Sequence, residues 1–247
     1  MDHLTQTLVG RRVLLTGGTT GIGRATLRCL AEDGARVLTC GRHQEPLDEA
    51  LSTASDAPGE VKGLVADVAT PEGIDRIFES VDSELGGLDV LIVCAALGAE
   101  PAHEMSDEAW RNVVETNLTG CIASARAALD RFDPEQGGHL VLISSISVHI
   151  KAPGESLYAA TKAGVNGFAE TLRKEVADRN VKVSVIEPGS VGSDMQPCDV
   201  EAQREAIARD EMLQAEEIAE AIRFVITRSR ACDVVTLRVE PRVQKYG

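Results

Sequence analysis

The sequence predicts an α/β protein built on one doubly wound parallel sheet of about seven strands, with helices on both faces. First, short β-branched runs alternate with longer helical stretches from one end of the 247 residues to the other. Second, the expected strands are nearly continuous apolar runs, which is typical of a parallel sheet covered on both faces. Third, the sequence has no internal repeat, low-complexity stretch or Pro/Gly/Ser-rich linker. Residues 1–247 are therefore expected to form a single domain.

The elements can be placed in order by their hydrophobic patterns. Strands are expected at residues 12–16, 36–40, 61–66, 90–94, 139–144, 181–187 and 234–239. Amphipathic helices are expected at residues 22–33, 71–85, 107–131, 157–178 and 215–227. Residues 190–209 are polar and charged and lie between a strand and the last long helix, so we expect a mobile flap there.

Composition narrows the possible partners and compartment. A formal net charge of −14 argues against nucleic acid and against an anionic membrane surface, because both are bound by basic surfaces. Six scattered cysteines without a C-x-x-C indicate a reducing compartment. No signal-peptide pattern and no apolar run of membrane-spanning length is found, so a cytoplasmic location is expected. The five histidines show no metal-ligand spacing, and no metal is expected.

A glycine-rich loop follows the first expected strand. Residues 16–23 read T-G-G-T-T-G-I-G and run directly into a helix. Such a turn aims backbone N–H groups and the positive end of the helix at one point, where a pyrophosphate can approach closely. A tight turn without a ligand is the alternative, but the position after the first strand favours dinucleotide binding. The residues expected to line the loop are Gly17, Thr19, Thr20, Gly21, Ile22 and Gly23.

The end of the second strand indicates which dinucleotide is preferred. A carboxylate there would bind the ribose hydroxyls of NAD(H), whereas an arginine would pair with the 2′-phosphate of NADP(H). The sequence has Gly41 and Arg42 and no carboxylate at this point. NADP(H) is therefore favoured and NAD(H) stays possible, since Arg42 could also be an ordinary surface charge.

A tyrosine and a lysine lie one turn apart at the start of a long helix. Tyr158 and Lys162 have the i, i+4 spacing that puts them on one helix face. A neighbouring ammonium favours the phenolate, which makes tyrosine useful for proton transfer to a carbonyl oxygen. Ser144 and Ser145 end the fifth strand, at the edge of the sheet where ligands gather. A hydroxyl there could hold the same substrate oxygen, although a pair of serines can also simply cap a turn.

In motif order, and over nearly its whole length, the chain resembles the short-chain dehydrogenases/reductases, a family with a Rossmann-like fold. The resemblance rests on T-G-x-x-x-G-x-G, the pair Asp67-Val68, N-L-T-G at 117–120, the serine, Y-x-x-x-K and Pro188-Gly189. It implies a catalytic tetrad of Asn117, Ser145, Tyr158 and Lys162. Ser145 lies thirteen positions before Tyr158, the separation usual in the family, and is therefore preferred to Ser144.

The resemblance also implies a role for each of these residues. Tyr158 would be the acid and base, and Ser145 would orient the carbonyl. Lys162 would hold the nicotinamide ribose, and Asn117 would hold a water that links Lys162 to solvent. Further contacts with the cofactor are expected from Asp67 and Val68 at the adenine, Val191 and Ser193 at the nicotinamide amide, and Ala95, Pro188 and Gly189.

The sequence departs from the family pattern in two places. V-C-A-A at 93–96 replaces the usual N-N-A-G, which removes a polar stabiliser of the central sheet. The usual V-D-G-G ending is also missing, and contacts near that end contribute to the homodimer or homotetramer expected for the family.

The leading interpretation is an NADP(H)-linked oxidoreductase that interconverts a small ketone or aldehyde with an alcohol, the cofactor supplying the hydride. An NAD-linked alcohol dehydrogenase working oxidatively is one alternative. A non-catalytic dinucleotide-binding regulator is another, but it would be expected to have lost part of the tetrad.

Overall fold

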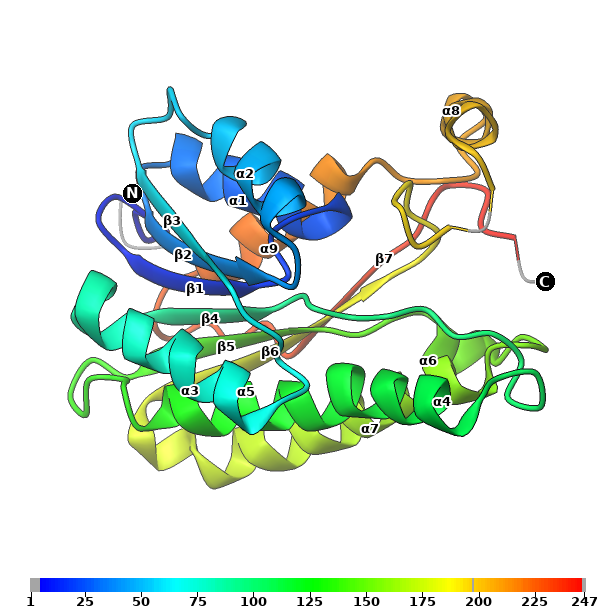
Figure 1. Ribbon diagram of the computed structural model, residues 1–247. Helices are drawn as coiled ribbons and strands as arrows, with labels where there is room; N and C mark the ends of the chain where they lie inside the picture. Colours follow the sequence, from blue (N-terminus) through cyan, green and yellow to red (C-terminus); the bar gives the residue numbers. More distant parts are fainter. Residues whose placement is uncertain (1–4, 197, 246–247) are drawn as a thin grey trace.

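The computed structural model describes residues 5–196 and 198–245. Within these residues seven parallel strands form one sheet in the order β3-β2-β1-β4-β5-β6-β7 (Figure 1). The strands are β1 (Arg12–Thr16), β2 (Arg36–Gly41), β3 (Glu60–Val65), β4 (Val90–Val93), β5 (Gly138–Ile143), β6 (Val181–Pro188) and β7 (Thr236–Val239). The predicted doubly wound parallel sheet is confirmed, and each strand begins and ends within two residues of its expected position.

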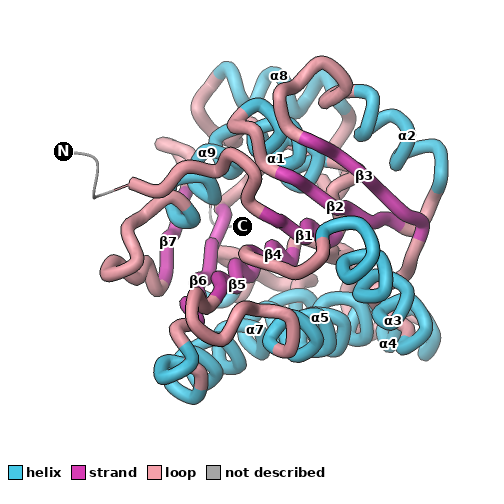
Figure 2. The backbone as a smooth tube through the Cα atoms, turned by 90° about the vertical axis from the view of Figure 1, so that its left-hand side faces the viewer, coloured by secondary structure: helices cyan, strands magenta, loops and turns pink. Residues whose placement is uncertain are grey.

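Helices form one layer on each face of the sheet (Figure 2). One layer contains α1 (Gly21–Glu32), α2 (Gln44–Ser52) and α9 (Ala215–Ile226). The other contains α3 (Pro71–Ser80), α4 (Asp107–Val114), α5 (Gly120–Leu129) and α7 (Ser156–Glu175). The short α6 (Ser147–Ile150) and α8 (Val200–Ala208) lie beyond the carboxyl ends of the strands (Figure 1).

Neighbouring strand residues belong to opposite layers of the core. Leu14 and Leu91 pack with Phe78 in one apolar cluster, whereas Leu15 and Ile92 belong to the other. All five side chains are at most 2% exposed. Because side chains alternate between the faces of a strand, burial of both faces requires an unbroken apolar run.

Two long helices of the sequence prediction are interrupted by wider π-helical turns. The stretch 71–85 ends in such a turn at Val81–Leu85, and the stretch 107–131 contains one at Glu115–Thr119. Helix α2 was not predicted, because only Leu47 and Ala50 of its nine residues are buried and the apolar stripe is correspondingly short.

The strand order reverses between β1 and β4, the first strands of the two halves of the sheet. Thr16 at the end of β1 is level with Cys40 of β2 on one side and Val93 of β4 on the other. The connections leave these two strands toward opposite faces, which opens a crevice at their carboxyl ends. The residues that the sequence singles out lie along this edge.

Candidate active site

The glycine loop after β1 has a backbone that only glycine accommodates. Gly17 has φ +73°, and a Cβ atom there would lie 2.6 Å from the Cα atom of Ala95. A Cβ atom on Gly23 would lie 1.9 Å from the carbonyl oxygen of Gly17. The loop is therefore closed tightly against both β4 and its own helix, as the sequence predicts for a phosphate-binding turn.

The N-terminus of α1 has the features of an anion site. Thr20 precedes the helix without capping it through its side chain, and no acidic residue lies in the first turn. The first N–H groups of α1 are therefore not satisfied by a side chain, and the helix dipole is not neutralised. Ser193 lies directly over this turn, since a Cβ atom on Gly21 would be 3.0 Å from the Ser193 Cβ atom. This arrangement fits the pyrophosphate of a dinucleotide, which Thr19, Thr20, Gly21 and Ile22 would surround.

The end of β2 packs closely against the glycine loop and carries a positive charge. A Cβ atom on Gly41 would lie 2.3 Å from Cγ2 of Thr19, so the two segments are in close contact. Arg42 is exposed and has no hydrogen bond or ion pair with any described residue. Asp67 borders the same corner, where its charge and, above all, burial raise the pKa of the Cys40 thiol to about 12. Val68, the next residue, is buried in the core.

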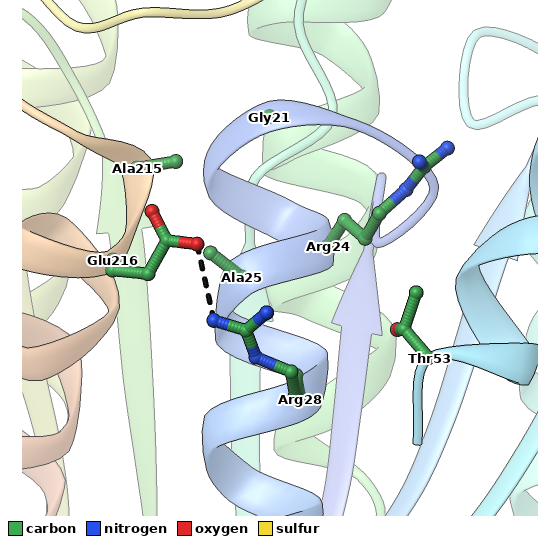
Figure 3. Close-up of a pocket in the computed structure, with 7 residues that line it drawn as sticks. All are labelled: Gly21, Arg24, Ala25, Arg28, Thr53, Ala215 and Glu216. Carbon is green, nitrogen blue, oxygen red and sulfur yellow. Dashed lines mark hydrogen bonds and ion pairs between the residues drawn. The ribbon is translucent and has the colours of Figure 1, made fainter. Parts of the chain in front are cut away.

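A second arginine supports the glycine loop and was not singled out from the sequence. Arg24 Nε donates to the carbonyl oxygen of Thr19 at 2.7 Å, and its Nη2 donates to Glu49 at 3.1 Å. Figure 3 shows Arg24 on the flank of α1 beside a pocket of about 100 Å³, pointing away from Arg28. Arg28 instead pairs with Glu216 at 3.0 Å. The sequence alone does not show which arginine of α1 contacts the glycine loop and which forms a surface ion pair.

Tyr158 and Lys162 lie together on α7, as their spacing predicts. The Lys162 Nζ atom is 5.5 Å from the centre of the Tyr158 ring. Lys162 is 3% exposed, and its ammonium donates to the carbonyl oxygen of Ile143, the last residue of β5, at 2.8 Å. This bond fixes the lysine between the helix and the strand edge, next to the half-buried tyrosine.

Asn117 connects the π-helical turn Glu115–Thr119 with two other segments. Its Oδ1 accepts from the N–H of Leu97 at 2.7 Å, and its Nδ2 donates to the Leu97 carbonyl at 2.8 Å. Nδ2 also lies 3.3 Å from the hydroxyl of Thr161, which neighbours Lys162. The asparagine therefore ties the loop after β4 to α7. Its expected role in holding a water stays a prediction.

The two serines after β5 have different surroundings. The Ser144 hydroxyl is buried and donates to the backbone carbonyl of Lys162 at 3.3 Å, so it fastens α7 to the sheet. The Ser145 hydroxyl lies 3.1 Å from that of Ser147. Ser147 in turn donates to the carboxylate of Glu155 at 2.7 Å. Neither Ser147 nor Glu155 was recognised from the sequence, because their contact depends on the path of the loop between α6 and α7.

The segment after β6 closes the site from the flap side. The carbonyl of Pro188 accepts from the N–H of Ile146, and the N–H of Gly189 donates to Val239. Val191 is buried, and backbone bonds at 2.9 Å connect its neighbours Ser190 and Gly192 to Leu213. This pairing brings the beginning of the predicted flap, including Ser193, over the glycine loop.

A buried carboxylate lies below the serines. Glu187 is 3% exposed and accepts from the amide of Asn166 at 2.7 Å. Its other oxygen is 2.9 Å from Nε2 of the half-exposed His149. These contacts connect β6, α6 and α7 next to the predicted catalytic residues.

The described residues were also compared with the requirements of a metal site and of a membrane span. They contain no cluster of three or more His, Cys, Asp or Glu side chains suited to holding a metal ion. None of the helices described is both long and apolar enough to span a bilayer.

A family model described as short chain dehydrogenase matches residues 11–204. The chain belongs to the short-chain dehydrogenase family. It is 32% identical over 227 residues to the 3-oxoacyl-[acyl-carrier-protein] reductase FabG of Escherichia coli K12, covering 90% of this chain and 92% of that protein. It is 37% identical over 190 residues to an uncharacterized oxidoreductase of Mycobacterium tuberculosis, with 75% of each chain covered.

A solved structure of an actinorhodin polyketide ketoreductase variant with NADPH has a TM-score of 0.85 and 28% identity to this member of the family. The match covers 96% of this chain and 98% of that one. The Rossmann-like fold and the family resemblance read from the sequence are both confirmed, and the protein is an oxidoreductase of this family that uses a nicotinamide dinucleotide.

Proposed function

We propose that the protein is an NADP(H)-linked oxidoreductase that interconverts a small ketone or aldehyde with the corresponding alcohol. The observation that carries the proposal is that Lys162 contacts both Tyr158 and the end of β5, two residues before Ser145. Asn117 contacts the loop after β4 at the same edge of the sheet, and the N-terminus of α1 beside the glycine loop has no side-chain cap. The names of two relatives, a 3-oxoacyl-carrier reductase and a ketoreductase with NADPH, support the reductive direction.

In this proposal Tyr158 donates a proton to the carbonyl oxygen, and the hydroxyl of Ser145 donates a hydrogen bond to the same oxygen. The bound nicotinamide supplies the hydride. Lys162, held by Ile143, contacts the ribose and favours the phenolate that remains on Tyr158. Gly17 and Gly21 allow the pyrophosphate to approach, with Asp67 and Val68 at the adenine. Val191 and Ser193 contact the nicotinamide amide from the flap side.

The preference for NADP(H) rests on Arg42. Its guanidinium is exposed at the end of β2 with no partner among the described residues, and the preceding residue, Gly41, packs against Thr19 of the glycine loop. A planar guanidinium pairs well with a phosphate dianion, whereas the hydroxyl of NAD(H) offers it no charge.

The proposal also covers the flap, the oligomeric state and the cellular location. Residues 190–196 and 198–209, including α8, would act as a mobile flap over the substrate within a single domain, and residue 197 of the predicted flap lies outside the described residues. The enzyme would work as a cytoplasmic homodimer or homotetramer.

The test is a fluorescence titration of the purified protein with NADPH and with NADH, followed by a screen of ketones and aldehydes with the preferred cofactor. We expect tighter binding of NADPH, and loss of that preference in Arg42→Asp. Tighter binding of NADH would refute the role of Arg42, and binding of neither cofactor would refute the proposed function.

A further inference from the structure

Hydrogen bonds link Ser145 to a carboxylate at the start of α7. The backbone N–H of Ser147 donates to Oγ of Ser145 at 3.1 Å. The Ser145 hydroxyl donates to Oγ of Ser147, also at 3.1 Å, and the Ser147 hydroxyl donates to Oε2 of Glu155 at 2.7 Å. Glu155 immediately precedes α7 and lies three residues before Tyr158.

The carboxylate fixes the direction of both hydroxyl groups. An ionised carboxylate can only accept hydrogen bonds, so the Ser147 proton points to Glu155. The Ser147 oxygen is then left as an acceptor for the Ser145 proton. Hydrogen bonds to charged groups are the stronger ones, and they polarise the next bond of a chain. Ser145 and Ser147 are 8% and 7% exposed, so water competes little with this arrangement.

We propose that Glu155 is a positioning residue that acts through Ser147 to hold the Ser145 proton away from the substrate. A bound carbonyl must therefore compete with Ser147 for that proton. The inference rests on the proposed function, in which Ser145 donates to the substrate oxygen. Because an oxygen gaining negative charge is the better acceptor, the restraint is overcome most readily in the transition state.

The chain offers a substitution that removes only the competing acceptor. Ser147→Ala deletes Oγ but keeps the backbone N–H that holds Ser145 in place. We expect kcat/KM for carbonyl reduction to rise by about two- to tenfold, the range of one neutral hydrogen bond. Glu155→Gln should change it in the same direction by less, because a neutral amide polarises Ser147 more weakly.

The double variant tests whether the two residues act in series. If Glu155 acts only through Ser147, Glu155→Gln should have no further effect on kcat/KM in the Ser147→Ala background. Ser147→Thr keeps a hydroxyl and should behave as the wild type. Ser156→Ala, an exposed position next to Glu155, is the matched control for changes at the start of α7.

The experiment measures steady-state carbonyl reduction, NADPH binding and thermal unfolding for every variant. An increase in kcat/KM at unchanged NADPH affinity supports the inference, because loss of a purely structural contact would lower kcat/KM. An unchanged or lower kcat/KM in folded Ser147→Ala, or an added effect of Glu155→Gln in the double variant, would overturn it.

The same measurements also identify a variant that does not fold and a wild-type protein that lacks the proposed activity. If Ser147→Ala does not fold, Glu155→Gln and Glu155→Leu test the same sign of the effect, and a fall in kcat/KM in both overturns the inference. A wild-type protein that binds NADPH but reduces no carbonyl of the screen refutes the proposed function, and the inference falls with it.

Discussion

Acid should destabilise this protein partly through one histidine in the sheet. His139 lies in β5, is 3% exposed, and its Nε2 atom is 2.8 Å from the hydroxyl of Ser184. Burial, with smaller effects from the charges of Lys182 and Arg11, lowers the pKa of His139 to about 3. The imidazole is therefore neutral in the folded protein from pH 7.5 down to pH 4.5.

The size of the effect follows from the difference in pKa between the two states. An unfolded histidine has a pKa of about 6.5, so below that value the unfolded chain binds one more proton than the folded chain at this site. The stabilisation is fully present above pH 6.5 and is lost as the pH falls toward the folded value. One pH unit corresponds to about 1.36 kcal/mol, so over the two units between pH 6.5 and pH 4.5 His139 should cost about 3 kcal/mol of unfolding free energy.

Urea unfolding of the wild type and of His139→Gln at pH 7.5 and pH 4.5 measures this cost. The carboxylates titrate in both proteins and cancel in the comparison, so the wild type should lose about 3 kcal/mol more than the variant. NADPH binding at pH 7.5 serves as the control, since His139 lies near the opposite end of β5 from Ser145. Equal losses in the two proteins would refute the assignment of a buried neutral imidazole.

Three further predictions concern the site. Tyr158→Phe removes the proton donor and should abolish turnover while NADPH binding stays within about twofold; turnover near the wild-type rate would refute the assignment. Gly17→Ala should weaken NADPH binding by at least about tenfold, since the new Cβ atom meets Ala95 and φ is positive; an unchanged affinity in a titration would mean that the loop adapts. Arg24→Gln should weaken NADPH binding several-fold, because it removes the hydrogen bond that holds the Thr19 carbonyl. Arg28→Gln is the control and should leave NADPH binding unchanged, since Arg28 pairs with Glu216 instead. Similar NADPH affinities for the two variants would contradict this prediction.

The central strands could be predicted closely because burial on both faces imposes a pattern that no surface segment shares. Helical spacing alone puts Tyr158 and Lys162 on one face of a helix, but the prediction of a catalytic role for them also needed the glycine loop and the family resemblance. The choice of Ser145 over Ser144 needed the family resemblance. The structure gives an independent physical difference, because the Ser144 hydroxyl is engaged with the backbone of α7.

Other features depend on local geometry that residue patterns do not record. The π-helical turn at Glu115–Thr119 interrupts a stretch of ordinary helix-forming residues, so the sequence predicts one continuous helix. The bond between Ser147 and Glu155 requires the chain to reverse after α6, where Lys151 has φ +55°. Arg24 is distinguished from Arg28 only by its contact with Thr19, which no spacing rule anticipates.

The predicted cofactor contacts lie at the ends of central strands, whereas the predicted substrate contacts lie in the connections, and this separation affects how such an enzyme can acquire new substrates. Lys162, the proposed ribose contact, is hydrogen-bonded to the last residue of β5, and Gly17 of the glycine loop is in close contact with Ala95 just after β4. Both proposed cofactor-binding elements are therefore held by the ends of central strands. The segments that would surround a substrate lie outside the strands: 97–101 follows β4, 151–155 connects α6 and α7, and 193–196 with 198–208 follows β6 and includes α8. Insertions or exchanges in these connections can reshape the binding surface while the register of the reacting groups is preserved. Specificity could therefore change through these connections while the predicted reacting groups keep their positions.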